Sequence, residues 1–70
     1  MMYEVSIERT DTKGLPKSST TVFVFDRKDY AMRFAESATA TEAVMSVEVW
    51  GIDKAMEEES ILWRWSRGVW

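Results

Sequence analysis

Apolar and polar residues alternate in short stretches of this chain, and this alternation constrains its fold more than any other feature. Within residues 3–10, the apolar residues Tyr3, Val5 and Ile7 are separated by polar or charged ones. Residues 43–50 repeat the pattern. A period of two places every second side chain on the same face of an extended backbone. Both stretches therefore predict strands with one buried face.

Two further stretches have the composition of strands. Residues 20–25 read TTVFVF and are β-branched or aromatic on both faces, so we expect a central strand or one covered on both faces. Residues 61–65 read ILWRW and place Ile61 and two tryptophans on one side. Bulky side chains at this spacing favour a strand over a helix.

The segments between these stretches predict turns. Residues 11–19 contain the only proline, a glycine and two serines, which is typical of a loop. Gly51 marks the expected end of the third strand. Residues 52–60 form either an acidic hairpin loop or a second helix capped by Asp53, and we favour the loop.

One stretch has the period of a helix, predicted over residues 27–38. Asp26 precedes it and is expected to accept a hydrogen bond from the exposed amides of the first turn. Asp29 partly imitates the acid of a capping box, while Phe25 and Tyr30 stand in the positions of a hydrophobic staple. The apolar stripe of this helix consists of Tyr30, Ala31, Phe34, Ala35 and Ala38.

These elements predict an α+β fold in a single small domain, residues 1–70. We expect one antiparallel sheet of about four strands in β-β-α-β-β order, with one helix packed on one face. The helix side of the core is expected to contain Val5, Ile7, Phe34, Val47, Val49, Ile61, Trp63 and Trp65. The opposite face is expected to show Glu4, Ser6 and Glu8, with some of Val22, Val24, Val44, Trp50, Leu62 and Trp70.

The composition limits how this fold is stabilised and what chemistry it supports. A chain of 70 residues buries only about 60% of the surface that its unfolded form exposes, so its core is marginal. It contains no cysteine and no histidine, which excludes disulfides, zinc-finger ligation and thiolate or imidazole catalysis. Apolar runs are only a few residues long, and Glu4 and Glu8 interrupt any signal-peptide core. We expect a cytoplasmic protein without a membrane segment.

Candidate catalytic and metal-binding groups are weak. A lysine that acts as a base needs a lowered pKa. Lys17 and Ser18 lie in an expected loop, where nothing would desolvate the lysine. The three glycines are isolated, so no phosphate-binding loop is present. The acidic run Glu57–Glu59 lacks the ligand spacing of a calcium loop, and a solvated loop is the favoured interpretation. We therefore expect no enzyme activity, no cofactor and no metal.

Aromatic and basic residues near the C-terminal end are the remaining candidates. The segment Trp63–Arg67 combines tryptophans with arginines. We favour a place in the core for its tryptophans, with protein contact as the next interpretation. Nucleic-acid binding ranks last, because the net charge is −3. Trp50 and Trp70 fall on the phase opposite to the main apolar set of their segments, and exposed aromatic residues often mark contact surfaces. The predicted partner-binding residues are Trp50, Leu62, Arg64, Arg67 and Trp70.

The sequence thus favours a non-enzymatic protein-interaction module, self-associating as a homodimer through an uncovered sheet face. The first alternative is a small regulatory protein of phage or mobile-element type that inhibits a host enzyme or nucleic-acid complex, which rests on analogy of size and style. A nucleic-acid-binding module is the third. The expected partner is a protein, including a second copy; binding to nucleic acid or membrane is not expected.

Overall fold

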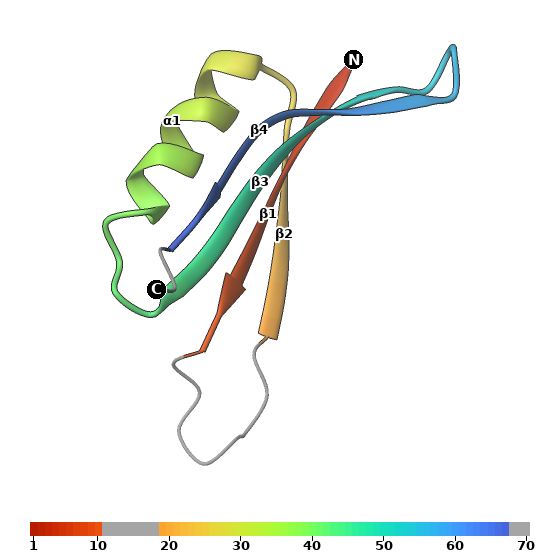
Figure 1. Cartoon of the computed structure of the whole chain (residues 1–70). Coiled ribbons are helices and arrows are strands. Elements are labelled where there is room, and N and C mark those ends of the chain that lie inside the picture. The colour runs from red at the N-terminus through yellow and green to blue at the C-terminus, as the bar shows by residue number, and fades with distance from the viewer. Residues whose placement is uncertain (11–18, 68–70) are drawn as a thin grey trace.

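A four-stranded antiparallel sheet with a single helix forms the structure (Figure 1), a computed structural model that describes residues 1–10 and 19–67. The predicted α+β class and the order of the elements are confirmed. The elements are β1 (Met2–Arg9), β2 (Ser19–Phe25), α1 (Lys28–Ala38), β3 (Val44–Asp53) and β4 (Glu58–Ser66).

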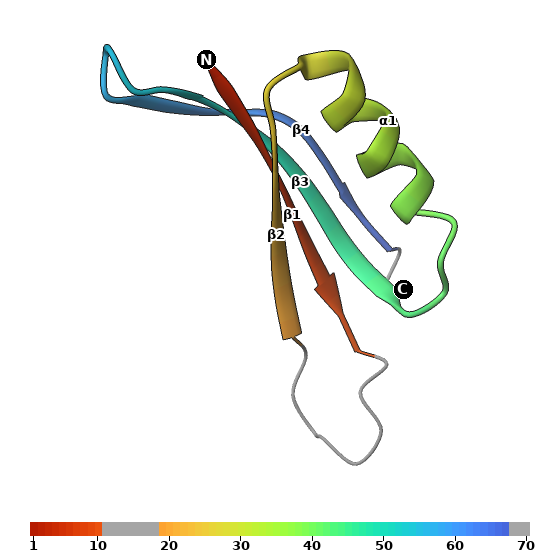
Figure 2. The same ribbon diagram turned by 180° about the vertical axis from the view of Figure 1, so that it is seen from behind.

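The strands lie in the order β2-β1-β3-β4, with every neighbouring pair antiparallel. The connection through α1 carries the chain from β2, across β1, to β3, so β1 is inserted between them and β2 becomes an edge strand. The prediction that residues 20–25 are central or covered on both faces is therefore wrong. Their composition reports a preference for extended backbone and says nothing about the strand's position in the sheet. The view from behind shows α1 on one side of the sheet only (Figure 2).

The buried core is small and lies between α1 and the two central strands. Among the residues that the structure describes, no side chain larger than valine is fully buried, and the tryptophans of β4 are only partly buried against the core. Val5, Ile7, Val47 and Val49 are buried as predicted. Val44, expected on the opposite face, is 3% exposed and belongs to this core. It precedes the regular alternation of β3, at the point where β1 has a register shift, so the phase of the strand does not extend to it. The buried set is Val5, Ile7, Ala31, Ala35, Val44, Val47 and Val49.

A β-bulge in β4 changes which of its side chains face the helix. Trp50 is paired with Ile61, and Leu62 is the extra residue. A Cβ atom on Gly51 would lie 3.2 Å from Leu62 Cδ1, so Leu62 lies over Gly51. Neighbouring residues of a strand point to opposite faces, which places Leu62 on the side opposite to Trp50 and Ile61 on the same side as Trp50. The prediction of Ile61 as core is wrong, since this side chain is 41% exposed.

The strand β3 continues past Gly51, which was expected to end it, because the missing side chain leaves space for Leu62. The hairpin of β3 and β4 turns at residues 54–57, so the predicted hairpin is confirmed in place of a second helix. Residues 52–53 and 58–60, which were expected in the loop, belong to the strands. Asp53 Oδ1 accepts hydrogen bonds from the backbone N–H groups of Ala55 at 3.1 Å and Met56 at 3.3 Å. The hairpin projects beyond the rest of the sheet (Figure 1).

The helix begins one residue later than the sequence indicates. Its N-cap is Arg27, with extended φ and ψ of −131° and 134° and no side-chain capping bond, so the prediction of Asp26 as the cap is wrong. The Arg27 carbonyl accepts the first helical hydrogen bond, from Ala31 N at 3.1 Å. The Arg27 guanidinium bonds Asp29 at 3.3 Å and lies 4.8 Å from the centre of the Tyr30 ring. These contacts hold the first turn from outside, while Ala31 and Ala35 allow close packing on the sheet.

Candidate functional site

The face of the sheet that α1 leaves open is a candidate contact surface; we call it the uncovered face. The pairing registers bring its side chains together from all four strands, because residues opposite each other in a sheet share a face. Its members at the centre of the sheet are Glu4, Ser6, Glu8, Val22, Val24, Ser46, Glu48, Trp50, Ile61 and Arg64. Toward the ends of the strands, the same registers add Met2, Thr20, Ile52, Glu59 and Ser66.

A polar network organises the centre of the uncovered face. Glu48 Oε1 accepts a hydrogen bond from Trp50 Nε1 at 3.1 Å, and Glu48 Oε2 pairs with Arg64 Nη2 at 3.1 Å. Ser46 Oγ donates to Glu8 Oε1 at 3.2 Å. The Arg64 side chain is 65% exposed, so its ion pair adds little stability by itself. Its effect is to fix Glu48, which in turn orients the indole of Trp50.

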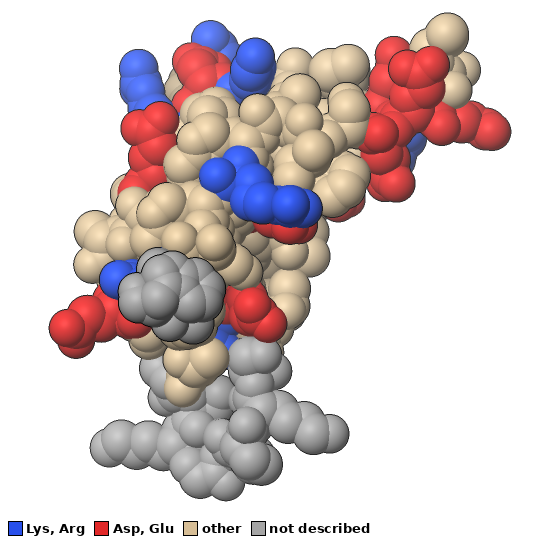
Figure 3. Space-filling model, viewed as in Figure 1, with Lys and Arg blue, Asp and Glu red and all other residues tan. Residues whose placement is uncertain are grey.

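Apolar side chains lie at the two margins of the uncovered face. On β2, Val22 and Val24 are 51% and 52% exposed, and on β4 Ile61 is 41% exposed. Acidic side chains gather on the projecting hairpin at the end of β3 and β4 (Figure 3). The surface thus combines exposed apolar side chains at two margins with a polar centre. Exposed apolar side chains that gather on one face mark candidate contact surfaces.

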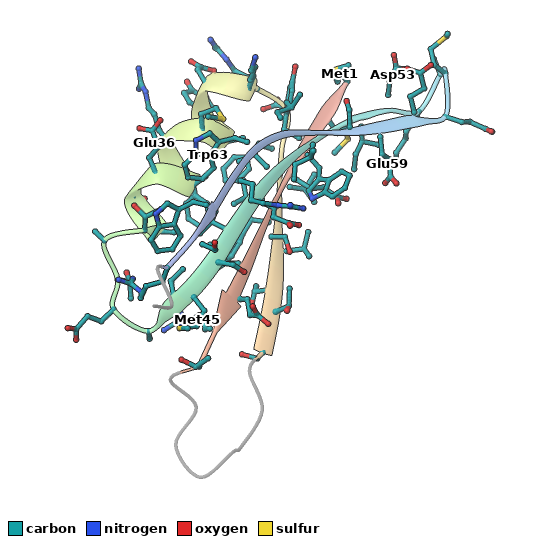
Figure 4. The ribbon with its side chains drawn as sticks, in the orientation of Figure 1. Met1, Glu36, Met45, Asp53, Glu59 and Trp63 are labelled. Carbon is teal, nitrogen blue, oxygen red and sulfur yellow. The ribbon has the colours of Figure 1, made fainter. Side chains whose placement is uncertain are left out.

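The structure brings together two of the five predicted partner-binding residues. Trp50 and Arg64 lie on the uncovered face and share Glu48 as a partner. Leu62 lies on the other side, over Gly51. Trp70 lies outside the described residues. On the helix side of β4, Trp63 packs against the core (Figure 4), as the alternation of residues 61–65 indicated for this residue.

Arg67 is engaged by the chain itself. Its guanidinium donates hydrogen bonds to the carbonyl oxygens of Thr41 at 2.8 Å, Val44 at 3.0 Å and Thr39 at 3.4 Å, in the connection between α1 and β3. It also lies 5.1 Å from the centre of the Trp65 ring. The donors that a partner would contact are therefore directed to backbone carbonyls, and Arg67 ties the last strand to the end of the helix.

Sequence reasoning missed the edge position of β2, which leaves its apolar side chains about half exposed. Val22 and Val24 were placed on the opposite face, but their strand was expected to be covered. One signal was present: residues 19–25 contain no charge and follow a proline-containing segment, whereas residues 58–66 contain three charged residues. Ile61 was missed because a one-residue bulge leaves no trace in an alternating pattern.

A groove of about 250 Å³ lies between the end of α1 and the strands β1 and β2. Ile7, Phe23 and Phe34 contribute apolar walls, and the rings of Phe23 and Phe34 are 4.7 Å apart. Ser37 and Thr41 supply hydroxyl groups at its border. Ser37 Oγ donates to the Phe34 carbonyl at 2.8 Å. Arg9 and Thr21 also line the groove, so its apolar walls have a polar and basic border.

Across residues 1–10 and 19–67, no group of three or more metal-ligating side chains is brought together. The carboxylates of Glu57–Glu59 lie along the turn and the start of β4, where alternation directs neighbours to different sides. Within the same residues, no helix is both long enough and apolar enough to cross a membrane. Comparison of the chain with protein-family models, with curated proteins and with solved structures gives no match.

Proposed function

We propose that this chain is a non-enzymatic protein-interaction module that contacts its partners through the uncovered face and the adjoining edge of β2. The observation that carries the proposal is the sheet with a helix on one face only, which leaves Val22, Val24 and Ile61 about half exposed. Isolated exposed apolar residues are common, but several on one face mark a contact surface.

The small core supports the same conclusion. The fully buried side chains are no larger than valine, whereas the described phenylalanines and tryptophans all keep part of their surface exposed. Aromatic side chains provide much of the energy of protein interfaces. A bound protein would remove this apolar surface from water, at about 25 cal/mol for each Å².

The charges of the uncovered face favour a protein partner over a nucleic acid. Glu4, Glu8 and Glu48 place three carboxylates on this face, and Arg64, its one basic residue in the described strands, is already paired with Glu48. Binding to a phosphate backbone depends on unpaired basic groups that displace counterions.

Site-specific photo-crosslinking tests the proposal. A benzophenone amino acid replaces Ile61 or Val24 on the uncovered face, or Arg33 on the exposed side of α1 as the matched control. In lysate of the cells that make the protein, we expect discrete adducts from positions 61 and 24 that are absent or at least tenfold weaker from position 33. Equal labelling at all three positions, or none at any, would overturn the proposal.

A further inference from the structure

The outer edge of β2 is an unusually open strand edge. Ser19–Phe25 is paired with β1 in an unbroken register of seven residues, and none of the other described segments pairs with its outer side. The strand contains no charge, no proline and no bulge. Val22, Phe23 and Val24 in its middle are 51%, 39% and 52% exposed. Natural proteins normally protect an edge strand by at least one of these devices, because its free N–H and C=O groups otherwise pair with another strand.

The opposite edge of the same sheet carries that protection. β4 has a bulge at Leu62 and the charged residues Glu58, Glu59 and Arg64. The half of β4 that begins at Glu58 also belongs to the projecting hairpin, and its side chains are exposed. The two edges of one sheet therefore differ in accessibility, and the difference points to β2 as the edge that pairs.

Charge decides between two ways in which second copies could meet. Stacking two uncovered faces would bring Glu4 and Glu48 of each copy into one poorly hydrated layer, where Arg64 is already paired with Glu48. Like charges brought together in this way oppose association. Pairing of two β2 strands brings together serine, threonine, valine and phenylalanine only. The second arrangement has no charge to desolvate.

We propose that the occupant of the β2 edge is the β2 strand of a second copy of this chain, paired antiparallel about a two-fold axis at Val22. This inference rests on the proposed function and names the partner and the mode of contact. Val22 is the middle residue of Ser19–Phe25, so this register pairs all seven residues. Val22 faces Val22 of the second copy, Thr21 faces its Phe23, and Thr20 faces its Val24. The two residues of each pair lie on the same face of the joined sheet, so the apolar side chains of the two copies meet on matching faces.

The product is a continuous eight-stranded sheet with both helices on one face. Such an isologous contact closes on itself and leaves no further open edge of the β2 type. It gives the half-exposed valines at the margin of each uncovered face a cross-strand neighbour and extends the Phe23, Phe25 and Phe34 cluster across the axis. Each copy thereby gains apolar contact along β2, where Val22, Phe23 and Val24 are exposed.

Charge substitution at the axis tests this arrangement by sedimentation equilibrium of the full chain. Val22→Lys places two ammonium groups opposite each other across the axis, and like charges directly opposite destabilise a strand pair. We expect a dimer for the unmodified chain and at least about a tenfold higher dissociation constant for V22K, since each copy also loses the apolar contact of a valine at the axis. Met56→Lys is the control, because it also exchanges an exposed apolar side chain for lysine, at 65% exposure, but in the turn between β3 and β4 and outside the strands. Its dissociation constant is expected to match that of the unmodified chain. Circular dichroism confirms that each variant is folded.

Mixing provides the second measurement. Val22→Glu alone is expected to dissociate like V22K, and an equimolar mixture of V22E and V22K is expected to recover the dimer, because the paired charges are then opposite. A dimer unaffected by V22K and V22E, or a mixture that does not re-associate, would overturn the β2 arrangement while leaving the proposed function intact. A chain that is monomeric up to millimolar concentration would overturn self-association, and the crosslinking experiment would then decide the proposed function separately.

Discussion

At the scale of single residues, Glu57 occupies a turn position whose backbone conformation disfavours any side chain. Its φ is 53°, in the left-handed region, where it ends the turn between β3 and β4. A left-handed backbone costs a residue with a Cβ atom about 1–2 kcal/mol, and glycine avoids this cost but loses more entropy on folding. Glu57→Gly is expected to raise the free energy of unfolding by about 0.5–1 kcal/mol. Urea unfolding followed by tryptophan fluorescence at fixed protein concentration measures it.

The neighbouring position is the control for this change. Glu58 begins β4, where glycine weakens the strand, so Glu58→Gly is expected to lower stability by up to about 1 kcal/mol. If both variants lose stability, the backbone of residue 57 is not strained in the way described.

Arg67 shows that a residue predicted for partner contact has a structural role in the fold. Hydrogen bonds from a charged donor contribute about 1.5–3 kcal/mol when they are well shielded. Arg67 is part-buried and reaches the carbonyls of Thr39, Thr41 and Val44. Arg67→Ala is therefore expected to lower the free energy of unfolding by about 2 kcal/mol, and Arg67→Lys by nearly as much, since an ammonium group does not reproduce the planar set of donors. Thermal unfolding by circular dichroism measures both.

Arg64→Ala serves as the comparison, because it removes an arginine whose partner is the exposed carboxylate network of Glu48. It is expected to cost no more than about 1 kcal/mol. Equal losses at positions 64 and 67 would contradict the structural role of Arg67.

At the scale of elements, the existence and type of each strand and of the helix could be predicted, but their exact partners could not. Alternation in β1 and β3 and the alanine stripe of α1 depend on local spacing, which the sequence contains directly. The edge position of β2 depends on which strands pair, and its residues would suit a central strand equally well. The bulge at Leu62 requires the space over Gly51, which becomes visible only once β3 and β4 are paired.

The first turn of α1 offers an element-scale test. Arg27 has the extended backbone of an N-cap but makes no side-chain cap bond. Serine at this position accepts a hydrogen bond from the free amides of the first turn, which is worth about 1 kcal/mol. Arg27→Ser loses an exposed ion pair worth less than that, so a net gain of about 0.5 kcal/mol is expected. Chemical denaturation measures it, with Lys28→Ser as the control; equal effects of both substitutions would show that residue 27 is not the cap.

At the scale of the whole molecule, stability is distributed unevenly along the sheet. The buried side chains lie where β1 and β3 pass under α1, whereas residues 52–60 of the hairpin are half-buried or exposed. Regions with few buried contacts open locally at a lower free energy than the core. Backbone amides of Val5, Val47 and Val49 are expected to exchange with solvent deuterium at least about a hundredfold more slowly than those of residues 52–60. Uniform protection along β3, measured by NMR, would contradict this distribution.

Which residues form the candidate site also depends more on the arrangement of the whole sheet than on any single strand. Trp50 and Arg64 were predicted as contact residues from their phase in the alternation, and the structure places both on the uncovered face. Val22 and Val24 were also among the residues expected on the opposite face, but the edge position of their strand was not predicted. Exposure at a sheet edge depends on strand order, and strand order depends on the crossover through α1.

The inserted position of β1 has a consequence for how the chain is made. β1 leaves the ribosome before β2, α1 and β3, yet it is completed on both sides only when β3 arrives from far along the chain. Until then, the nascent chain holds a two-stranded ribbon that is only marginally stable alone, with apolar strand edges exposed on both sides. Because distant contacts form more slowly than local ones, we expect the closure of this contact, and not the formation of either hairpin, to limit the rate of folding. Before this contact closes, the chain depends most on protection from association with the neighbouring nascent chains of the same polysome.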